Sequence, residues 1–355
     1  VYKRQALGRT MTLTRAPAMA AAPYRLSLNE SPYGPLPAVA RVLAAGVAEV
    51  NRYPDFFPDR LRAAIAAHLS VAADRISVGP GATGLAHTVL AESSVRARGR
   101  GVTAPRLVTS TPTFDGYPIL AGMLGIEVRA TRLDTDGGTD LDALAGAVDA
   151  DTAAVAICSP HNPTGSVVSE DALVAFLREV PPSVTVIFDE AYAEFCDDPP
   201  DMIGLTRRFP TLVALRTFSK AHGLAALRVG YALAGAEMGA ALRSREIPFA
   251  VGPAALAAVP VALAARAELD DRVRAMRTER ARLSAMLTAI GASPLPSQGN
   301  FVFLPGDDGL QVGTLLNTVG VLGKRCGDFG FRLTVGDCAS TDYLVGALRL
   351  TARTA

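Results

Sequence analysis

From about residue 75 onward, short apolar runs alternate with longer amphipathic stretches, and this alternation limits the fold more than any other feature of the sequence. The apolar runs lie at residues 76–78, 106–110, 153–158, 184–188, 212–216 and 229–234. Stretches between them, such as 85–95 and 141–148, have the periodicity of helices. Strands that alternate with helices form a largely parallel sheet covered on both faces. The sequence therefore predicts an α/β fold, whose ligands bind at the carboxyl ends of the strands.

Length and charge narrow the class of protein further. The chain has 355 residues and 49% hydrophobic content, enough for two domains or one large domain with a satellite. Its 35 basic and 34 acidic residues create no overall field that would attract nucleic acid or an anionic membrane. No apolar run approaches the roughly 18 residues that span a bilayer. Residues 1–23 lack the apolar core of a signal peptide, so we interpret them as a disordered extension.

The cysteines indicate a reducing compartment. They show no C-x-x-C spacing, and a chain of this length does not need disulfides to fold: Cys158, Cys196, Cys326 and Cys338. We expect free thiols and a cytoplasmic protein. The sequence contains no metal-ligand spacing, so no metal site is predicted.

One lysine lies in a segment of small and apolar residues, where it is partly desolvated. Desolvation lowers the pKa of Lys220 and makes its amine a nucleophile toward an aldehyde or ketone. Ser219 and Arg228 supply a hydroxyl and a guanidinium group, which together can hold a phosphate. An ordinary surface lysine is the alternative. The combination indicates pyridoxal 5'-phosphate (PLP), with Lys220 as its attachment point.

The same segment resembles the cofactor-lysine motif of the fold-type I, class I/II aminotransferases, and especially their histidinol-phosphate aminotransferase branch. The matching positions keep their register: Thr217, Ser219, Lys220, Gly223, Leu224, Ala225, Leu227, Arg228 and Gly230. The resemblance implies a large domain with a mostly parallel seven-stranded sheet flanked by helices, and a small α+β domain. It extends from about Leu26 to the C-terminus.

The resemblance also divides the chain and implies its assembly. We expect residues 24–50 to join the small domain, residues 51–250 to form the large PLP-binding domain, and residues 251–355 to form the small C-terminal domain. Residues 253–290 predict a long helix with a break near Pro260. Tyr53 matches a family tyrosine that contacts the cofactor phosphate of the neighbouring subunit, which implies a homodimer with shared active sites.

A glycine-rich loop between a strand and a helix offers a phosphate site. Residues 79–84 read Gly-Pro-Gly-Ala-Thr-Gly, formally the G-x-G-x-x-G pattern of dinucleotide-binding folds. That pattern requires an acidic residue at the end of the next strand, but residues 106–110 end in hydroxyl side chains. An NAD-binding α/β module is therefore the less favoured alternative. Free N–H groups at a helix N-terminus bind any phosphate, which assigns Gly81, Ala82 and Thr83 to the cofactor.

Further cofactor contacts are expected at strand ends. A carboxylate at the end of a buried strand needs a cation, and a protonated pyridine nitrogen would supply it for Asp189. The resemblance implies that Asn162 and Tyr192 contact the phenolic oxygen of the cofactor. It also implies that Phe114, where the family usually has tyrosine, stacks on the pyridine ring; a core phenylalanine is the alternative.

The resemblance implies a second group of residues that contact the substrate. Arg332 matches the arginine that binds the substrate α-carboxylate, and Arg325 matches one directed at a distal phosphate. Tyr33 and Asn29 belong to an N-terminal loop that covers the active site, and Asn300 belongs to a segment beside the substrate.

The chemistry implied is transamination between an amino donor and a 2-oxo acid. The expected substrates are histidinol phosphate or an amino acid, an aromatic one first, with the 2-oxoglutarate/glutamate pair as partner. A decarboxylase of the threonine-phosphate type and an amino-acid oxidase have a similar cofactor site, so both remain open as alternatives.

Overall fold

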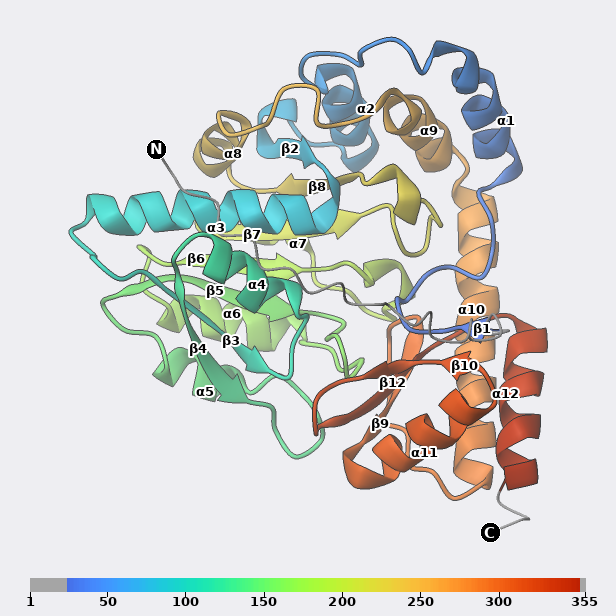
Figure 1. Cartoon of the computed structure of the whole chain (residues 1–355). Coiled ribbons are helices and arrows are strands. Elements are labelled where there is room, and N and C mark those ends of the chain that lie inside the picture. Colours follow the sequence, from blue (N-terminus) through green and yellow to red (C-terminus); the bar gives the residue numbers. More distant parts are fainter. Residues whose placement is uncertain (1–23, 352–355) are drawn as a thin grey trace, which may run out of the picture.

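A computed structural model describes residues 24–351 and is built around a seven-stranded sheet (Figure 1). The strand order is β2-β8-β7-β6-β5-β3-β4. Only β8 runs antiparallel to its neighbours, because β3 to β7 pair in parallel. The mostly parallel sheet is therefore confirmed. Its strands are β2 (Ile76–Gly79), β3 (Arg106–Thr111), β4 (Glu127–Arg132), β5 (Thr152–Cys158), β6 (Thr185–Asp189), β7 (Leu212–Thr217) and β8 (Gly230–Leu233).

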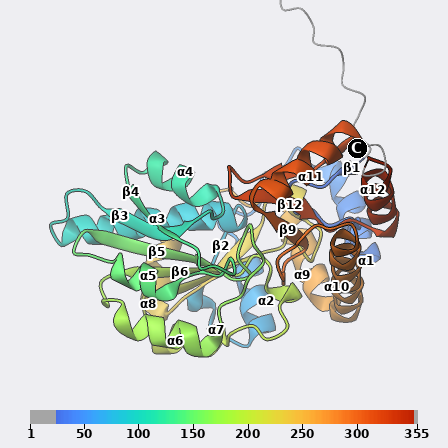
Figure 2. The same ribbon diagram turned by 90° about the horizontal axis from the view of Figure 1, so that it is seen from below.

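Helices cover both faces of this sheet. Alternate side chains of β6 enter opposite cores, Val186 and Phe188 on one face and Ile187 on the other. One face packs against α3 (Gly81–Gly99), α4 (Gly116–Met123) and α8 (Ala236–Arg243). The other packs against α2 (Asp59–Leu69), α5 (Leu141–Gly146), α6 (Glu170–Glu179), α7 (Met202–Arg208) and α9 (Pro253–Ala264). Figure 2 shows α3 and α4 on one side of the strands, with α5, α6 and α7 on the other.

The apolar pattern of the sequence does not predict strand β4. It lies at the edge of the sheet, and nearly all of its side chains are exposed. An edge strand needs no continuous apolar run, and charged residues such as Glu127 and Arg129 protect it from pairing with another chain.

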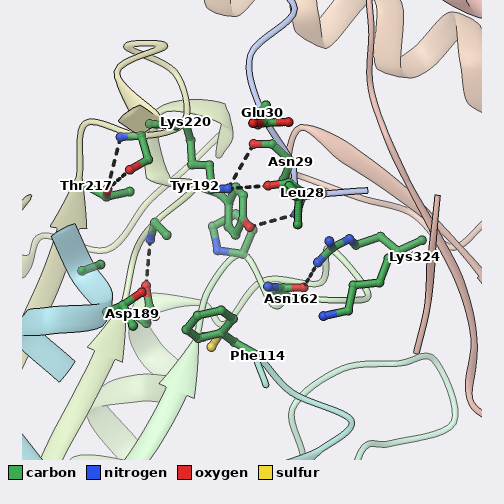
Figure 3. Close-up of a pocket in the computed structure, with 18 of the residues that line it drawn as sticks. Leu28, Asn29, Glu30, Phe114, Asn162, Asp189, Tyr192, Thr217, Lys220 and Lys324 are labelled. Atoms are coloured by element: carbon green, nitrogen blue, oxygen red, sulfur yellow. Dashed lines mark hydrogen bonds between the residues drawn. The ribbon is translucent and has the colours of Figure 1, made fainter. Parts of the chain in front are cut away.

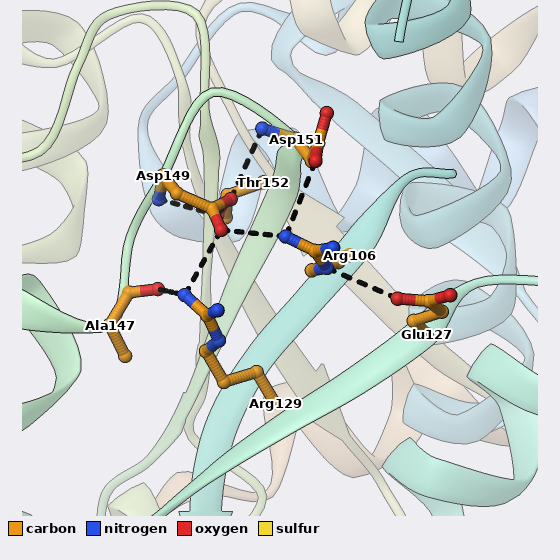
Figure 4. Close-up of polar contacts among 7 residues, drawn as sticks. All are labelled: Arg106, Glu127, Arg129, Ala147, Asp149, Asp151 and Thr152. Carbon is orange, nitrogen blue, oxygen red and sulfur yellow. Dashed lines mark hydrogen bonds and ion pairs between the residues drawn. The ribbon is translucent and has the colours of Figure 1, made fainter. Parts of the chain in front are cut away.

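An ion-pair network fixes the amino ends of β3, β4 and β5 (Figure 4). Arg106 contacts Asp149 at 2.7 Å, Glu127 at 3.1 Å and Asp151 at 3.3 Å. Arg129 contacts the same Asp149 at 3.0 Å. These contacts lie at the amino ends of the strands, on the opposite side of the sheet from the carboxyl ends. The carboxyl ends therefore stay open for ligands.

A smaller unit contains the C-terminal part of the chain. Its antiparallel sheet has the order β11-β12-β9. The N-terminal segment joins it, because β1 pairs in parallel with β10 and Leu26 is buried in the same core. The elements are β1 (Tyr24–Arg25), β9 (Phe301–Pro305), α11 (Gly306–Thr318), β10 (Val321–Leu322), β11 (Lys324–Arg325), β12 (Gly330–Thr334), α12 (Cys338–Thr351) and the long α10 (Arg266–Ala289).

The predicted position of the break in the long helical segment was wrong. Pro260 lies inside α9, and the break comes at Ala265, where ψ is 49°. Proline removes one hydrogen bond, but α9 buries Ala258, Val259 and Ala262 in the large core and packs along α1 (Pro37–Gly46). Tertiary packing therefore holds the helix through the proline.

The N-terminal segment contacts both units. Leu26 belongs to the core of the smaller unit, whereas Leu36 and Val39 belong to the core under the large sheet. The predicted domain boundaries stay a prediction, and the predicted disordered extension at 1–23 lies outside the described residues. Among residues 24–351, no helix combines the length and the apolar character that crossing a membrane requires.

Candidate active site

A cavity of about 290 Å³ opens at the carboxyl edge of the large sheet (Figure 3). The N-terminal segment and the β11–β12 hairpin close it from the smaller unit. The residues that line it come from distant parts of the chain: Leu28, Asn29, Glu30, Ala82, Thr83, Phe114, Cys158, Pro160, Asn162, Asp189, Ala191, Tyr192, Thr217, Ser219, Lys220, Ala225, Arg228, Lys324 and Arg332. This is the strand edge at which parallel α/β sheets bind their ligands.

Lys220 follows β7 and points its amine at the N-terminal segment. Its Nζ donates to the carbonyl oxygens of Leu28 at 2.9 Å and Asn29 at 3.0 Å. It also lies 5.6 Å from the ring centre of Tyr192. Burial, followed by the nearby Arg332 charge, lowers the pKa of Lys220 to about 8. About a tenth of this amine is therefore neutral, and nucleophilic, at pH 7, far more than for an ordinary lysine.

Asp189 ends β6 as a buried carboxylate on the cavity wall. Its side-chain oxygens accept hydrogen bonds from the Tyr117 hydroxyl at 2.9 Å and the Ala191 amide at 3.1 Å. Only 6% of Asp189 is exposed, and burial raises its pKa to about 6. Neither hydrogen-bond donor is a cation. The site thus holds a carboxylate that a cationic ligand atom in the cavity would stabilise.

An anion cradle lies beside Lys220, where α3 begins. The 19-residue α3 starts at Gly81, so the amides of its first turn have no partner within the helix. A Cβ on Gly81, whose φ is +76°, would lie 2.6 Å from the Arg228 guanidinium. Arg228 donates to the Ser219 hydroxyl at 3.3 Å, and Ser219 accepts from the Thr217 hydroxyl at 2.9 Å. Amides, hydroxyls and a guanidinium group therefore converge, as phosphate binding requires.

The opposite wall carries a buried arginine. Arg332, on β12, is 4% exposed and donates to the side-chain oxygen of Asn162 and to the Ser27 carbonyl at 2.6 Å. Its Nε has no hydrogen-bond partner among the described residues. Tyr192, whose hydroxyl accepts from Asn29 at 2.9 Å, and Phe114 complete this part of the wall.

Comparison with known families identifies the chain. The family described as "Aminotransferase class I and II" matches residues 23–348. The chain belongs to this family of aminotransferases. It is therefore a PLP-dependent enzyme of the transferase class.

Individual relatives agree with this family. The aromatic amino acid aminotransferase of Cutibacterium acnes is 37% identical over 327 residues, covering 91% of this chain and 91% of the relative. That of Thermobifida fusca is 39% identical over 315 residues, covering 88% and 86%. The crystal structure of histidinol-phosphate aminotransferase from Sinorhizobium meliloti, in complex with pyridoxal-5'-phosphate, matches with a TM-score of 0.84 and 26% identity, covering 93% and 91%.

The cavity of this aminotransferase has the groups that PLP requires. It offers an amine of lowered pKa at Lys220 for the aldehyde and a buried carboxylate at Asp189 for the pyridine nitrogen. The cradle beside Gly81 is shaped for a phosphate, because a side chain at Gly81 would collide with Arg228. The residues present therefore fit the aldehyde, the ring nitrogen and the phosphate of the cofactor.

Four other residues implied by the resemblance are not among those that line the cavity. Asn300 is buried and donates to the Asn29 carbonyl at 3.1 Å. Tyr33 packs beneath Arg272, 5.8 Å away. Arg325 is 63% exposed and binds Asp328 and the Gly327 carbonyl. Tyr53 is 84% exposed, with its ring 5.0 Å from that of Phe249.

The sequence interpretation missed several polar residues in or beside the cavity, among them Glu30, Lys324 and Tyr117. Lys324 lines the cavity in place of Arg325, since Lys324 lies opposite Arg332 in the β11–β12 pair and shares its face. Tyr117 donates to Asp189 from the first turn of α4. The position of Tyr117, shortly after the end of β3 and close to Phe114, could have indicated that it belongs to the site. Nothing in the sequence shows how β11 and β12 pair. That register decides that Lys324, and not Arg325, faces the cavity.

The lowered pKa of Lys220 predicts how the apoenzyme takes up PLP. Only the neutral amine attacks the aldehyde, so the attachment rate should rise with pH and reach half its maximum near pH 8, the Lys220 pKa. Stopped-flow absorbance between pH 6 and pH 11 measures this profile. Arg332→Met should raise the midpoint because it removes a positive charge beside the amine. A wild-type midpoint near the ordinary lysine value of 10.5 would contradict the assignment.

Proposed function

We propose that this aminotransferase transfers the amino group of an aromatic amino acid to 2-oxoglutarate. The observation that carries the proposal is the buried Arg332, which lines the same cavity as Lys220 and keeps an unpartnered Nε. A guanidinium group in this position suits the α-carboxylate of an amino acid. Histidinol phosphate has no carboxylate. The names of the Cutibacterium acnes and Thermobifida fusca relatives support the same choice.

We assign the cofactor contacts by the chemistry of each group. Bound PLP supplies an electron sink for the substrate. Asp189 keeps the pyridine nitrogen protonated by offering it a buried carboxylate. Asn162 and Tyr192 orient the phenolic oxygen side, and Phe114 packs against the ring. The phosphate contacts are Gly81, Ala82, Thr83, Thr217, Ser219 and Arg228.

Lys220 moves the proton in this proposal. With PLP and the substrate amine bound, the Lys220 Nζ would be free to take the proton from the substrate Cα. The same nitrogen, then charged, would return a proton to a carbon of the cofactor. A pKa of about 8 suits both steps, because the amine can be neutral as base and charged as acid within the physiological range.

The substrate contacts depend on the N-terminal segment and the smaller unit. Arg332 holds the α-carboxylate, and Asn29, through its contact with Tyr192, positions the segment that closes the cavity. Asn300 supports Asn29 through its carbonyl. Leu28 and Phe114 supply apolar wall for an aromatic side chain. Tyr33 remains a substrate contact that the resemblance implies, whereas Arg325, which pairs with Asp328 and does not line the cavity, is not assigned to the substrate.

A substrate panel tests the proposal. Single-turnover absorbance with phenylalanine, tyrosine, glutamate and histidinol phosphate should show amino transfer from the aromatic donors and from glutamate. Coupled detection of carbon dioxide and hydrogen peroxide separates transamination from the decarboxylase and oxidase alternatives. If only histidinol phosphate converted the cofactor, the aromatic assignment would be wrong.

We propose a homodimer as the active unit, and free thiols are in keeping with a cytoplasmic location. An exposed aromatic patch supports the dimer. The patch consists of four exposed aromatic side chains whose rings lie against one another: Tyr53, Phe56, Phe57 and Phe249. A patch of this kind on a single chain marks an interaction surface.

Subunit complementation tests whether Tyr53 acts across this interface. Lys220→Ala subunits and Tyr53→Ala subunits are each expected to be weak or inactive alone. After subunit exchange, one site in each mixed dimer combines an intact Lys220 with an intact Tyr53 and should regain activity. If the subunits exchanged and no activity returned, Tyr53 would have only a structural role. If the active protein sedimented as a monomer, the proposed dimer would be wrong.

A further inference from the structure

One arginine of helix α10, Arg272, reaches the two segments that close the active site. Figure 1 shows α10 running from α9, beside the large unit, to α12 in the smaller unit. Near the start of α10, Leu269 and Val273 are buried in the same small core as Ala221, the residue that follows Lys220. Arg272 therefore lies where this helix meets the loop that carries the cofactor lysine.

The guanidinium group of Arg272 binds two backbone carbonyls that belong to different segments. Its Nη1 donates to the carbonyl of His222, two residues after Lys220, at 3.3 Å. Its Nη2 donates to the carbonyl of Gly34, in the N-terminal segment, at 2.7 Å. The same group lies 5.8 Å from the ring centre of Tyr33, close enough for a cation–π contact. The planar fork of Arg272 therefore joins the lysine loop to the N-terminal segment.

The two segments also approach each other closely at Gly223. This residue has a φ of +70°, and a Cβ on it would lie 3.1 Å from Nη1 of Arg272 and 3.2 Å from the carbonyl oxygen of Tyr33. A side chain at this position would strain the backbone and push the lysine loop away from the N-terminal segment. Glycine therefore allows the close junction that Arg272 bridges.

Arg272 is a partly buried cation without a carboxylate partner among the described residues. Its neighbour on α10, Arg274, has one, since it pairs with Asp271 at 2.6 Å. Burial lowers the pKa of Arg272, because its charge has lost part of its contact with water. Placing a charge there without a counter-charge costs free energy. What the residue provides in return is the connection between the two segments.

The N-terminal segment forms part of the cavity wall, so its position affects substrate binding. Leu28, Asn29 and Glu30 line the cavity (Figure 3). Lys220 also holds this segment, because its Nζ donates to the carbonyls of Leu28 and Asn29. Those contacts need the free amine of Lys220, which the attachment of PLP takes up. The contacts of Arg272 do not involve that amine.

We propose that Arg272 is a positioning residue for transamination, which holds the N-terminal segment against the lysine loop and keeps this wall of the cavity formed before the substrate arrives. A preformed wall lowers the conformational entropy that substrate binding must overcome. Arg272 does not line the cavity itself, so its loss should raise KM and leave kcat nearly unchanged. The inference uses the aminotransferase activity of the family and goes beyond the proposed function, because it holds for any amino donor.

The first test separates KM from kcat in the PLP-loaded enzyme. In Arg272→Met, the KM for glutamate and for phenylalanine should rise about tenfold, the loss of one charged hydrogen bond, and kcat should stay within about threefold. Arg272→Lys keeps the stem and the charge but loses the fork, so it should show a similar rise even if Arg272→Met folded poorly. Ethylguanidinium at millimolar concentration should lower the KM of Arg272→Ala toward the wild-type value, a recovery that a purely structural role would not give.

The second test uses the apoenzyme and needs no turnover. The chain contains no tryptophan, so Tyr33→Trp introduces a single fluorescent reporter on the N-terminal segment, where the larger ring can keep its contact with the guanidinium group. In Tyr33→Trp/Arg272→Met, acrylamide should quench this tryptophan at least about twice as strongly, because the segment is no longer held against the lysine loop.

Arg274→Met is the matched control. Arg274 lies two residues further along α10, and its side chain is 71% exposed and pairs with Asp271. Its substitution should change neither KM nor the quenching. An unchanged KM in Arg272→Met, or an equal rise in Arg274→Met, would overturn the proposal. A fall in kcat without a change in KM would also overturn it, because Arg272 would then act in the chemical step.

The same measurements separate this inference from the proposed function. If the wild-type enzyme failed to convert phenylalanine, the proposed donor would be wrong. The KM for glutamate and the quenching of the tryptophan reporter would still decide whether Arg272 positions the N-terminal segment.

Discussion

Lys220→Ala is expected to lower turnover by at least about 10⁴-fold, the largest effect of any single change in this chain. The substitution removes both the amine that attaches PLP and the group that moves the proton at the substrate Cα. The anion cradle beside Gly81 and the carboxylate of Asp189 remain, so PLP should still bind without a covalent link. Steady-state kinetics measure the loss, and equilibrium dialysis measures the retained cofactor.

Chemical trapping gives an independent test of the same residue. The chain contains three lysines, Lys3, Lys220 and Lys324, so borohydride reduction followed by peptide mapping has few possible outcomes. The label should appear on Lys220 in the wild type and in Lys324→Ala. It should be absent from Lys220→Ala. A label on Lys3 or Lys324 in the wild-type enzyme would refute the assignment.

Much of the large sheet could be predicted because its strands are buried on both faces. Buried parallel strands read as continuous apolar runs, and residues 153–158 and 184–188 correspond to β5 and β6. The edge strand β4 carries charged side chains and has no such run. The break at Ala265 depends on packing between helices, which a local proline signal does not encode.

The cofactor side of the cavity was easier to predict than its substrate side. Lys220, Ser219 and Arg228 lie within one short segment whose spacing is visible in the sequence. Asp189 is the last residue of a buried strand, where an acidic residue stands out against the apolar run. These positions depend on local structure and on the general rule that ligands bind at carboxyl strand ends.

The substrate side depends on pairing between distant or irregular segments. Lys324 and Arg325 are neighbours, but the register of β11 against β12 puts Lys324 opposite Arg332 and Arg325 opposite Phe331. A shift of one residue would exchange their faces. Nothing in the composition of the hairpin fixes that register, so the sequence alone could not choose between the two cations.

Asp189→Asn is expected to lower kcat by about 10²–10⁴-fold, the cost of removing one partner from a buried charge pair. The amide keeps an oxygen that can accept from Tyr117 or Ala191, so the wall should remain in place. What is lost is the negative charge that stabilises the protonated pyridine nitrogen. A pH titration of the bound cofactor's absorbance should report a lowered pyridine pKa, together with the loss in kcat.

Glu190→Gln provides the control, because it removes the same charge one residue further along the chain. Glu190 is 1% exposed and accepts two hydrogen bonds from Arg216, at 2.8 and 3.1 Å, and it does not line the cavity. Breaking a buried ion pair costs about 3–5 kcal/mol of folding stability, so Glu190→Gln should lower the Tm. Its turnover per bound cofactor should stay within about tenfold of the wild type, a smaller loss than the removal of a general acid or base causes. If Glu190→Gln reproduced the spectral shift and the kcat loss of Asp189→Asn, the effect would come from general loss of negative charge around β6, and Asp189 would have no special contact with the cofactor.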